Sequence, residues 1–143
     1  MPVKSSQHFL RYVLWADAIS CLACGLLQVT LTSILTVHLG LSQALLSGTG
    51  VFLLLWSAMV AFFATRAKVP NTLVGFLILG NIGWALLATG LLLEGDPRLT
   101  VLGKGYIVAQ ILTVLILAQL QYFCFRTDKA ARLASARPER QSE

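Results

Sequence analysis

The chain has 143 residues, of which 57% are hydrophobic and only 12% are charged, and its mean hydropathy is +0.77. Because a soluble domain normally carries about 25% charged residues, this composition argues against an ordinary water-soluble protein. The net charge of +5 comes mostly from the C-terminal tail and one short connection, so we do not expect nucleic-acid binding.

Four apolar segments of 21 to 25 residues follow one another along the chain: residues 13–37, 45–65, 73–93 and 103–125. The only Lys or Arg within them is Lys104, at the start of the last segment. About 20 helical residues span a hydrocarbon layer of about 30 Å, and helices satisfy their own backbone groups in lipid. The first segment is too long for the apolar part of a signal peptide, so we do not expect cleavage. The sequence therefore predicts an all-α membrane protein with four transmembrane helices in an up-down-up-down bundle.

The basic residues indicate how this bundle is oriented. Nine of the eleven would lie on one side of the membrane: Lys4, Arg11, Arg66, Lys68, Arg126, Lys129, Arg132, Arg137 and Arg140. Only Arg98 and Lys104 would lie on the other side. The positive-inside rule then predicts a cytoplasmic N-terminus (residues 1–12), a transmembrane bundle (residues 13–125) and a basic cytoplasmic tail (residues 126–143). We expect a bacterial-type cytoplasmic (inner) membrane, with anionic lipid headgroups near the tail.

The connections between the segments are short, which favours antiparallel neighbours. Between the first two segments, Gly40 is suited to end a helix and Ser42 to cap the next. Beyond Pro70, we expect Asn71 or Thr72 to cap the third helix. Before the fourth segment, Asp96 and Pro97 have the order of an N-cap and a first helical residue.

Polar residues recur along one face of the first segment. Asp17, Cys21, Cys24 and Gln28 are spaced by three or four residues and so share a helix face, opposite Ile19. The remaining positions on that opposite face are Trp15, Leu22, Leu26 and Val29. The later segments carry Ser57, Asn81, Gln110 and Gln121 on comparable stripes. Interfaces between membrane helices favour small residues and polar residues that bond across helices, so these stripes predict a polar-lined interior.

Depth along straight helices, at 1.5 Å per residue, predicts which of these residues meet. Asp17 and Gln121 would lie about 6 Å from the cytoplasmic boundary, whereas Gln28 and Gln110 would lie about 22 Å from it. A middle layer would contain Cys21, Ser57 and Asn81.

Asp17 has both a structural and a functional interpretation. It is the only acidic residue inside a segment, and an acid within a membrane is by default a candidate functional group. It also lies in the N-terminal part of its helix, where the macrodipole favours a carboxylate. We favour a structural role, with a proton or cation site as the alternative.

Cys21 and Cys24 form a C-x-x-C pair. In a four-span chain this resembles the vitamin K epoxide reductase-like and disulfide-oxidising quinone reductases. This chain differs because its pair lies in the cytoplasmic half of the first segment, and no second pair occurs in a periplasmic loop. Cysteine is also an ordinary buried residue, so we favour packing over redox chemistry. With His8 and His38 at opposite membrane faces, we expect no metal site, and no motif predicts a cofactor or catalytic residues.

These observations predict a small multi-pass, non-enzymatic accessory, scaffold or binding module. Its partners would be the lipid bilayer and either copies of itself or a larger membrane protein. A small transporter or channel that uses Asp17 and the intramembrane Gln and Asn residues is the alternative. A thiol redox enzyme that uses Cys21 and Cys24 is the third hypothesis.

Overall fold

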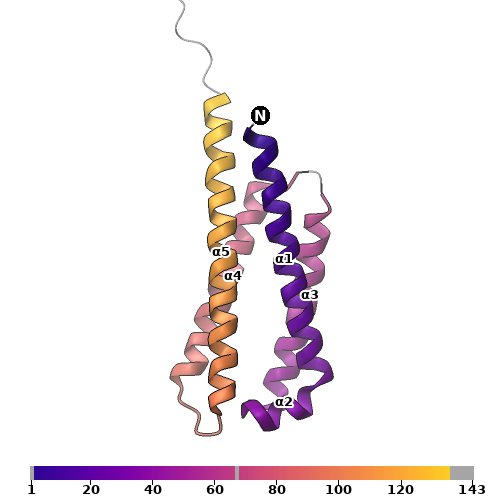
Figure 1. Ribbon diagram of the computed structural model, residues 1–143, viewed down its shortest axis with the longest axis vertical. Helices are drawn as coiled ribbons and strands as arrows, with labels where there is room; N and C mark the ends of the chain where they lie inside the picture. Colours follow the sequence, from indigo (N-terminus) through magenta and orange to yellow (C-terminus); the bar gives the residue numbers. More distant parts are fainter. Residues whose placement is uncertain (1, 67, 136–143) are drawn as a thin grey trace, which may run out of the picture.

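The computed structural model describes residues 2–66 and 68–135, and side chains from Gln7 onward within those ranges. The regular secondary structure of this part of the chain is entirely helical, with no strand, and short connections join the helices (Figure 1). Its elements are α1 (Pro2–Thr30), α2 (Thr32–Leu39), α3 (Gln43–Ala64), α4 (Asn71–Leu93) and α5 (Val101–Ser135). Four helical stretches are long and apolar enough to cross a membrane: Gln7–Thr30, Gln43–Ala64, Asn71–Leu93 and Val101–Ser135. The predicted all-helical class and the four apolar helices are thus confirmed.

The first apolar segment is divided rather than continuous over residues 13–37. The long helix ends at Thr30, Leu31 leaves the helical conformation with φ −109° and ψ 22°, and α2 follows as a separate short helix. The break falls in a run of hydroxyl residues, Thr30, Thr32, Ser33 and Thr36, of which the three threonine side chains bond back to the preceding turn. The Thr30 hydroxyl donates to Leu26 O at 2.6 Å, and that of Thr36 donates to Thr32 O at 2.8 Å. Such bonds compete with the helix ladder and bend helices.

Two of the predicted caps are confirmed between α2 and α3. Gly40 ends α2 with a left-handed φ of 71°, and a Cβ there would lie 1.7 Å from Arg98 O. Ser42 has an extended conformation, and its hydroxyl accepts a hydrogen bond from the Leu45 amide at 3.2 Å.

The two later cap predictions are wrong. Pro70 occupies the N-cap of α4 without a side-chain bond, because Asn71 is already helical. For α5 the cap is Thr100, whose hydroxyl accepts from the Gly103 amide at 3.0 Å. Asp96 instead accepts from the Arg98 amide at 2.9 Å and so stabilises the turn that precedes α5.

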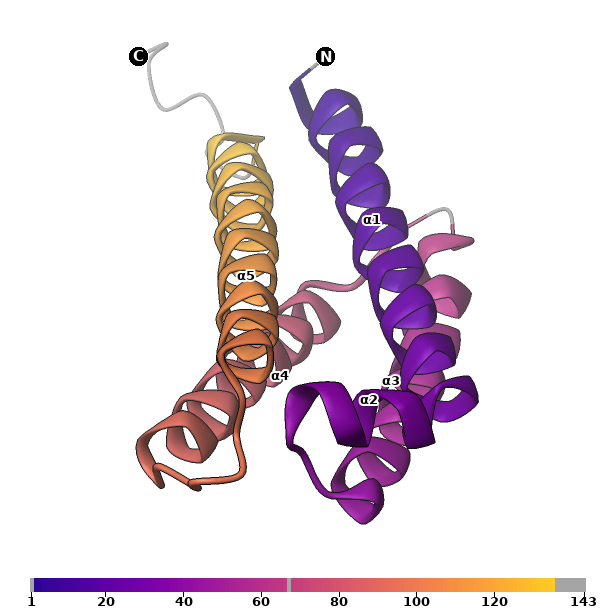
Figure 2. The same ribbon diagram turned by 60° about the horizontal axis from the view of Figure 1, so that its bottom comes forward.

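The long helices form two closely packed pairs, α1 with α3 and α4 with α5, and the pairs meet along α1 and α5. No Cα atom of α3 lies within 8 Å of one in α4. The beginning of α1 and the last turns of α5 lie at one end of the molecule, which we term the terminal end (Figures 1 and 2). The opposite end, with α2 and the α4–α5 connection, is the α2 end.

Glycine allows α1 and α3 to approach closely. A Cβ on Gly25 would lie 2.9 Å from Gly50 O, and one on Gly50 would lie 2.8 Å from Val29 Cγ2. Between α3 and α4, by contrast, aromatic side chains bridge a wider gap. The rings of Phe52 and Trp84 stack with centroids 5.5 Å apart.

Two apolar cores lie at the ends of this arrangement. The terminal-end core contains Leu10, Leu14, Ala18, Val60, Ala64, Val69, Val74, Leu77 and Cys124. The α2-end core contains Leu39, Leu41, Leu46, Leu99 and Ile107. On the outside, the five apolar residues predicted opposite the polar stripe of α1 are 40% to 59% exposed, as expected of a helix face turned away from the interior.

At the α2 end, the two helix pairs are joined through backbone groups. The Thr100 amide donates to Leu39 O at 3.1 Å, and its hydroxyl donates to His38 O at 2.6 Å. A Cβ on Gly103 would lie 2.1 Å from Leu39 O, so the start of α5 fits against the end of α2 only because glycine is there.

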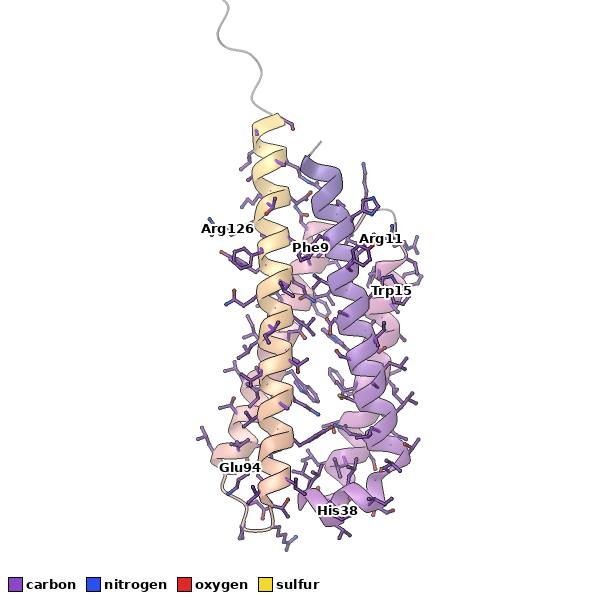
Figure 3. The ribbon with its side chains drawn as sticks, in the orientation of Figure 1. Phe9, Arg11, Trp15, His38, Glu94 and Arg126 are labelled. Atoms are coloured by element: carbon purple, nitrogen blue, oxygen red, sulfur yellow. The ribbon has the colours of Figure 1, made fainter. Side chains whose placement is uncertain are left out.

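At the terminal end, helical structure continues beyond the apolar segments. Residues predicted as the N-terminal flank belong to α1, and the predicted tail continues as α5 to Ser135, whereas residues 136–143 lie outside the described part. Gln7 Nε2 donates to the buried Asp128 Oδ1 at 3.2 Å, and Arg132 Nε lies 2.8 Å from Asp128 Oδ2. Arg11, labelled in Figure 3, donates to Ala64 O at 3.1 Å and so caps the last turn of α3.

Candidate functional site

A buried carboxylate lies between the two helix pairs. Asp17 on α1 has no solvent exposure, and its Oδ2 atom accepts from Gln121 Nε2 of α5 at 3.1 Å and from Asn81 Nδ2 of α4 at 3.4 Å. The other oxygen accepts from Cys21 Sγ at 3.4 Å. Asn81 also donates to Gln121 Oε1 at 3.3 Å. These four residues, Asp17, Cys21, Asn81 and Gln121, are termed the Asp17 cluster.

The Asp17 cluster connects α1, α4 and α5. Depth along the helices predicts that Asp17 and Gln121 meet, and the hydrogen bond between them confirms this. Asn81 was expected in a different layer, about one helical turn away, but its amide reaches Asp17. Ser57 does not join the cluster: its hydroxyl donates to Ala18 O at 2.7 Å and thereby connects α3 to α1.

A second polar group lies nearer the α2 end. Gln28 is 2% exposed, its Nε2 donates to the Tyr106 hydroxyl at 2.8 Å, and the Thr49 hydroxyl donates to its Oε1 at 2.8 Å. The predicted layer of Gln28 and Gln110 is thus correct in depth, but the two amides do not bond. Gln110 Oε1 accepts from Trp84 Nε1 at 3.2 Å instead.

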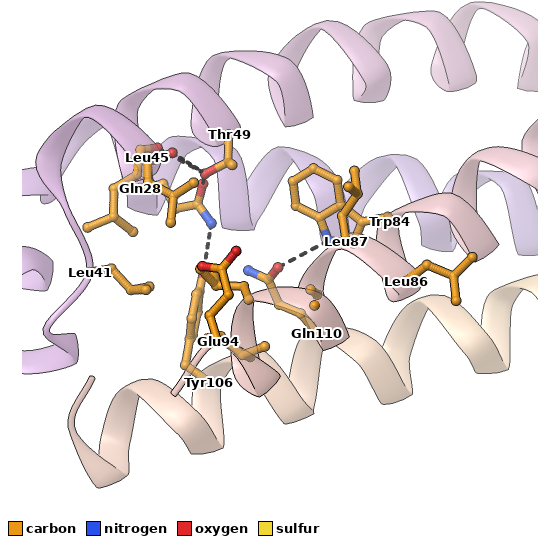
Figure 4. A pocket seen from close by; sticks show the side chains of 15 residues that line it. Gln28, Leu41, Leu45, Thr49, Trp84, Leu86, Leu87, Glu94, Tyr106 and Gln110 are labelled. Carbon is orange, nitrogen blue, oxygen red and sulfur yellow. Dashed lines mark hydrogen bonds between the residues drawn. The ribbon is translucent and has the colours of Figure 1, made fainter. Parts of the chain in front are cut away.

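These polar side chains line a cleft of about 430 Å³ between the two helix pairs, shown in Figure 4. The rest of its lining is mostly apolar. We use "the cleft" for the space lined by Gln28, Leu41, Leu45, Leu46, Thr49, Trp84, Leu86, Leu87, Ala88, Gly90, Leu91, Glu94, Tyr106, Ile107 and Gln110. Sites for small molecules are usually apolar cavities of about 300–1,000 Å³ with a few convergent polar groups.

One polar atom of the cleft lacks a partner among the described residues. Gln110 Nε2 is buried and makes no hydrogen bond, although its carbonyl oxygen is bonded to Trp84. Buried donors in native proteins are nearly always paired, so an unpaired one at a cleft is a candidate ligand contact.

Two smaller cavities share lining residues with both the cleft and the Asp17 cluster. One, of about 140 Å³, shares Trp84, Tyr106 and Gln110 with the cleft. The other, of about 200 Å³, reaches Asn81 and shares Cys21 with the first. Beyond the cluster, toward the terminal end, lies the terminal-end core.

Cys21 and Cys24 are thiols and form no disulfide in the structure. Cys21 donates a hydrogen bond to Asp17, while Cys24 lines the smaller of the two cavities described above. The described residues contain no group of three or more His, Cys, Asp or Glu side chains placed to hold a metal ion.

Thr49, Trp84 and Glu94 line the cleft but were not predicted as site residues. Thr49 adjoins Gly50, which lies on the small-residue face of α3. Trp84 lies three residues beyond Asn81, so it projects from the same side of α4. Glu94 is the C-cap residue of α4, so its position at the cleft depends on where α4 ends.

Comparison with known proteins finds no family model, no curated protein and no solved structure that matches this chain.

Proposed function

We propose that the chain is a non-enzymatic binding module of a bacterial-type cytoplasmic membrane, with four helices crossing up and down and both termini in the cytoplasm. The common position of the α1 start and the α5 end supports this topology (Figure 1). So does the distribution of charge. Arg11 and Arg126 lie toward the terminal end (Figure 3), whereas only Arg98 and Lys104 belong to the connection and first turn at the α2 end.

The topology is tested with fusions to the C-terminus. A fluorescent protein fused there should be bright, and alkaline phosphatase fused there should be inactive. Active phosphatase would place the C-terminus outside the cytoplasm and overturn the proposed orientation.

The binding function rests on one observation, the cleft with its unpaired Gln110 amide nitrogen. The cleft exists because α3 and α4 do not approach each other closely, while α1 and α5 close its inner side. Its polar groups are held in place by their own bonds to Trp84, Tyr106 and Thr49. A preorganised apolar space with fixed polar contacts suits binding better than catalysis, because no nucleophile and base converge there.

In this proposal the Asp17 cluster has a structural role: its hydrogen bonds hold the two helix pairs together, and it does not act as a reactive site. Its three neighbours all donate to one carboxylate, and they come from both helix pairs. Hydrogen bonds between membrane helices contribute about 0.6 kcal/mol each on average, so the cluster adds modest stability and fixes how the pairs are aligned. The cleft next to it then keeps a defined shape.

The experiment is to identify what the purified protein retains. The wild type should keep a small molecule through purification, detectable by mass spectrometry after organic extraction. Ala88→Trp, which fills the cleft, should lose it. Gly75→Trp is the matched control, because a Cβ on this α4 residue meets nothing within 4 Å and the residue does not line the cleft. No retained molecule in the wild type, or equal retention in both variants, would contradict the proposal.

A second candidate function is transport of a proton or small cation. The two smaller cavities favour it, because Cys21 and Asn81, which both bond to the Asp17 carboxylate, are among their lining residues. The terminal-end core would then be the closed side of an alternating-access path.

A further inference from the structure

The orientation of the Gln110 amide is fixed by its neighbour. The Trp84 indole nitrogen is only a donor, so the Gln110 atom that lies 3.2 Å from it must be the oxygen. The Nε2 atom therefore points the other way and has donors to offer. The Tyr106 hydroxyl lies close to the Gln110 amide but accepts its hydrogen bond from Gln28, so the two N–H groups of Gln110 Nε2 are not used by a bond of good geometry.

A ligand that completes this site must bring an acceptor. A buried donor without a partner costs about 1–3 kcal/mol, and a ligand oxygen at this position would remove that cost. A carbonyl oxygen fits because it accepts in a fixed direction. An alkyl ammonium has no acceptor and would leave the donor unpaired.

The charge of the cleft argues against an anion. Its lining contains no Lys, Arg or His, and its only ionisable acid is Glu94 at the exposed end of α4. A carboxylate or phosphate would lose its hydration without gaining a cation, which costs far more than burial of a neutral ester.

The remaining lining is suited to a hydrocarbon chain. Leucines come from α3, α4 and the connection before α3, and two of them also reach the outer surface. Leu86 is 68% exposed and Leu87 is 74% exposed, so the cleft opens sideways between α3 and α4. In a membrane this opening would face the acyl chains of the bilayer.

We propose that the cleft binds an uncharged amphiphile whose carbonyl oxygen accepts a hydrogen bond from Gln110 Nε2 and whose apolar chain lies along Leu86 and Leu87. This proposal rests on the binding function proposed above and names the chemistry of its ligand. The chemical class of this ligand is a neutral acyl ester.

The test uses the full chain in phosphatidylcholine nanodiscs and radiolabelled 1-decanoylglycerol as the probe. Binding above that of empty nanodiscs should be saturable. Unlabelled decanoylglycerol should compete, whereas decanoate and decyltrimethylammonium, which have the same chain length, should not compete at the same concentration. Competition by decyltrimethylammonium would instead indicate a cation site at Glu94, and competition by decanoate an anion site, and either result would overturn the proposal.

Variants locate the contact. Gln110→Leu should weaken binding about five- to tenfold, the loss expected for one hydrogen bond of about 1–1.4 kcal/mol. The matched control is Gln119→Leu, an exposed position on the same helix, which should bind as the wild type does. If Gln110→Leu does not fold, Gln110→Glu keeps the shape, replaces the donor by an acceptor and should also lose binding. Unchanged binding in a folded Gln110 variant would overturn the proposal.

Failure here is distinguishable from failure of the binding function. If decanoylglycerol does not bind, but purified wild type retains a molecule that Ala88→Trp loses, the ligand class is wrong and the binding function stands. If decanoylglycerol does not bind and the purified wild type retains no molecule, the ligand class and the binding function are both wrong.

Discussion

Gln121 Nε2 lies 3.1 Å from Asp17 Oδ2, although 104 positions separate the two residues in the chain. The bond joins the first long helix to the last and therefore joins the two helix pairs. Both side chains are fully buried, and Asn81 bonds to both of them. The contact also bears on the cleft, because the cleft lies between the same two pairs.

Substitutions at Asp17 should separate its hydrogen bonds from its charge. Asp17→Asn keeps an acceptor for Gln121 and Asn81, so we expect a change in unfolding free energy below about 1 kcal/mol. Asp17→Leu leaves both amides without their acceptor and should destabilise by about 1–2 kcal/mol. Thermal unfolding in detergent measures the difference. Equal destabilisation by both substitutions would mean that the charge itself holds the helices together.

The α1–α3 contact should be sensitive to a single methyl group. Gly50→Ala would place a Cβ 2.8 Å from Val29 Cγ2 and 3.2 Å from Gly25 O, so the helices must separate, at a cost of about 1–3 kcal/mol. Gly48→Ala, on the same helix, meets nothing within 4 Å and should be neutral or slightly stabilising. Melting temperatures that do not differ between the two variants would show that the close approach is absent in solution.

The junction at the α2 end provides a second matched pair within α5. Gly103→Ala would place a Cβ 2.1 Å from Leu39 O, whereas Gly105→Ala meets nothing within 4 Å. Because both gain the same helix propensity, the difference in their unfolding temperatures reports the clash alone. We expect only Gly103→Ala to lower stability and to increase protease sensitivity between α2 and α3. The junction has no structural importance if the two variants behave alike.

The thiols of α1 should remain reduced and be dispensable. Cys21 donates a weak hydrogen bond to Asp17, and no disulfide joins it to Cys24. The double substitution to Ala should therefore keep expression, stability within about 1 kcal/mol and retention of the bound molecule. Mass spectrometry after alkylation under denaturing conditions should find both thiols modified in the wild type. A Cys21–Cys24 disulfide, or loss of function with intact folding, would favour the redox hypothesis.

The sequence predicts the helices well because their signals are local. Long apolar runs locate all four long helices, and the spacing of Asp17, Cys21, Cys24 and Gln28 correctly identifies the inward face of α1. Gly40 and Ser42 also end and begin helices where expected, since backbone conformation and a single cap decide these points.

Other features depend on contacts between distant segments and were not predictable from local patterns. Thr100 caps α5 in place of Asp96 because the Thr100 amide and hydroxyl both bond to the end of α2. Gln28 and Gln110 share a depth but bond to other partners, since helix rotation decides which side chains meet. The cleft arises from the wide spacing of α3 and α4, and no stripe along either helix encodes that spacing.

A flux measurement in sealed proteoliposomes decides whether Asp17 only holds the two helix pairs together beside the cleft or also carries a proton or cation. Wild type and Asp17→Asn are compared at matched thermal stability, with proton and monovalent-cation gradients applied. For both proteins we expect a flux no higher than that of protein-free liposomes. Flux in the wild type that disappears in an equally stable Asp17→Asn variant would contradict this expectation and establish Asp17 as a transport residue.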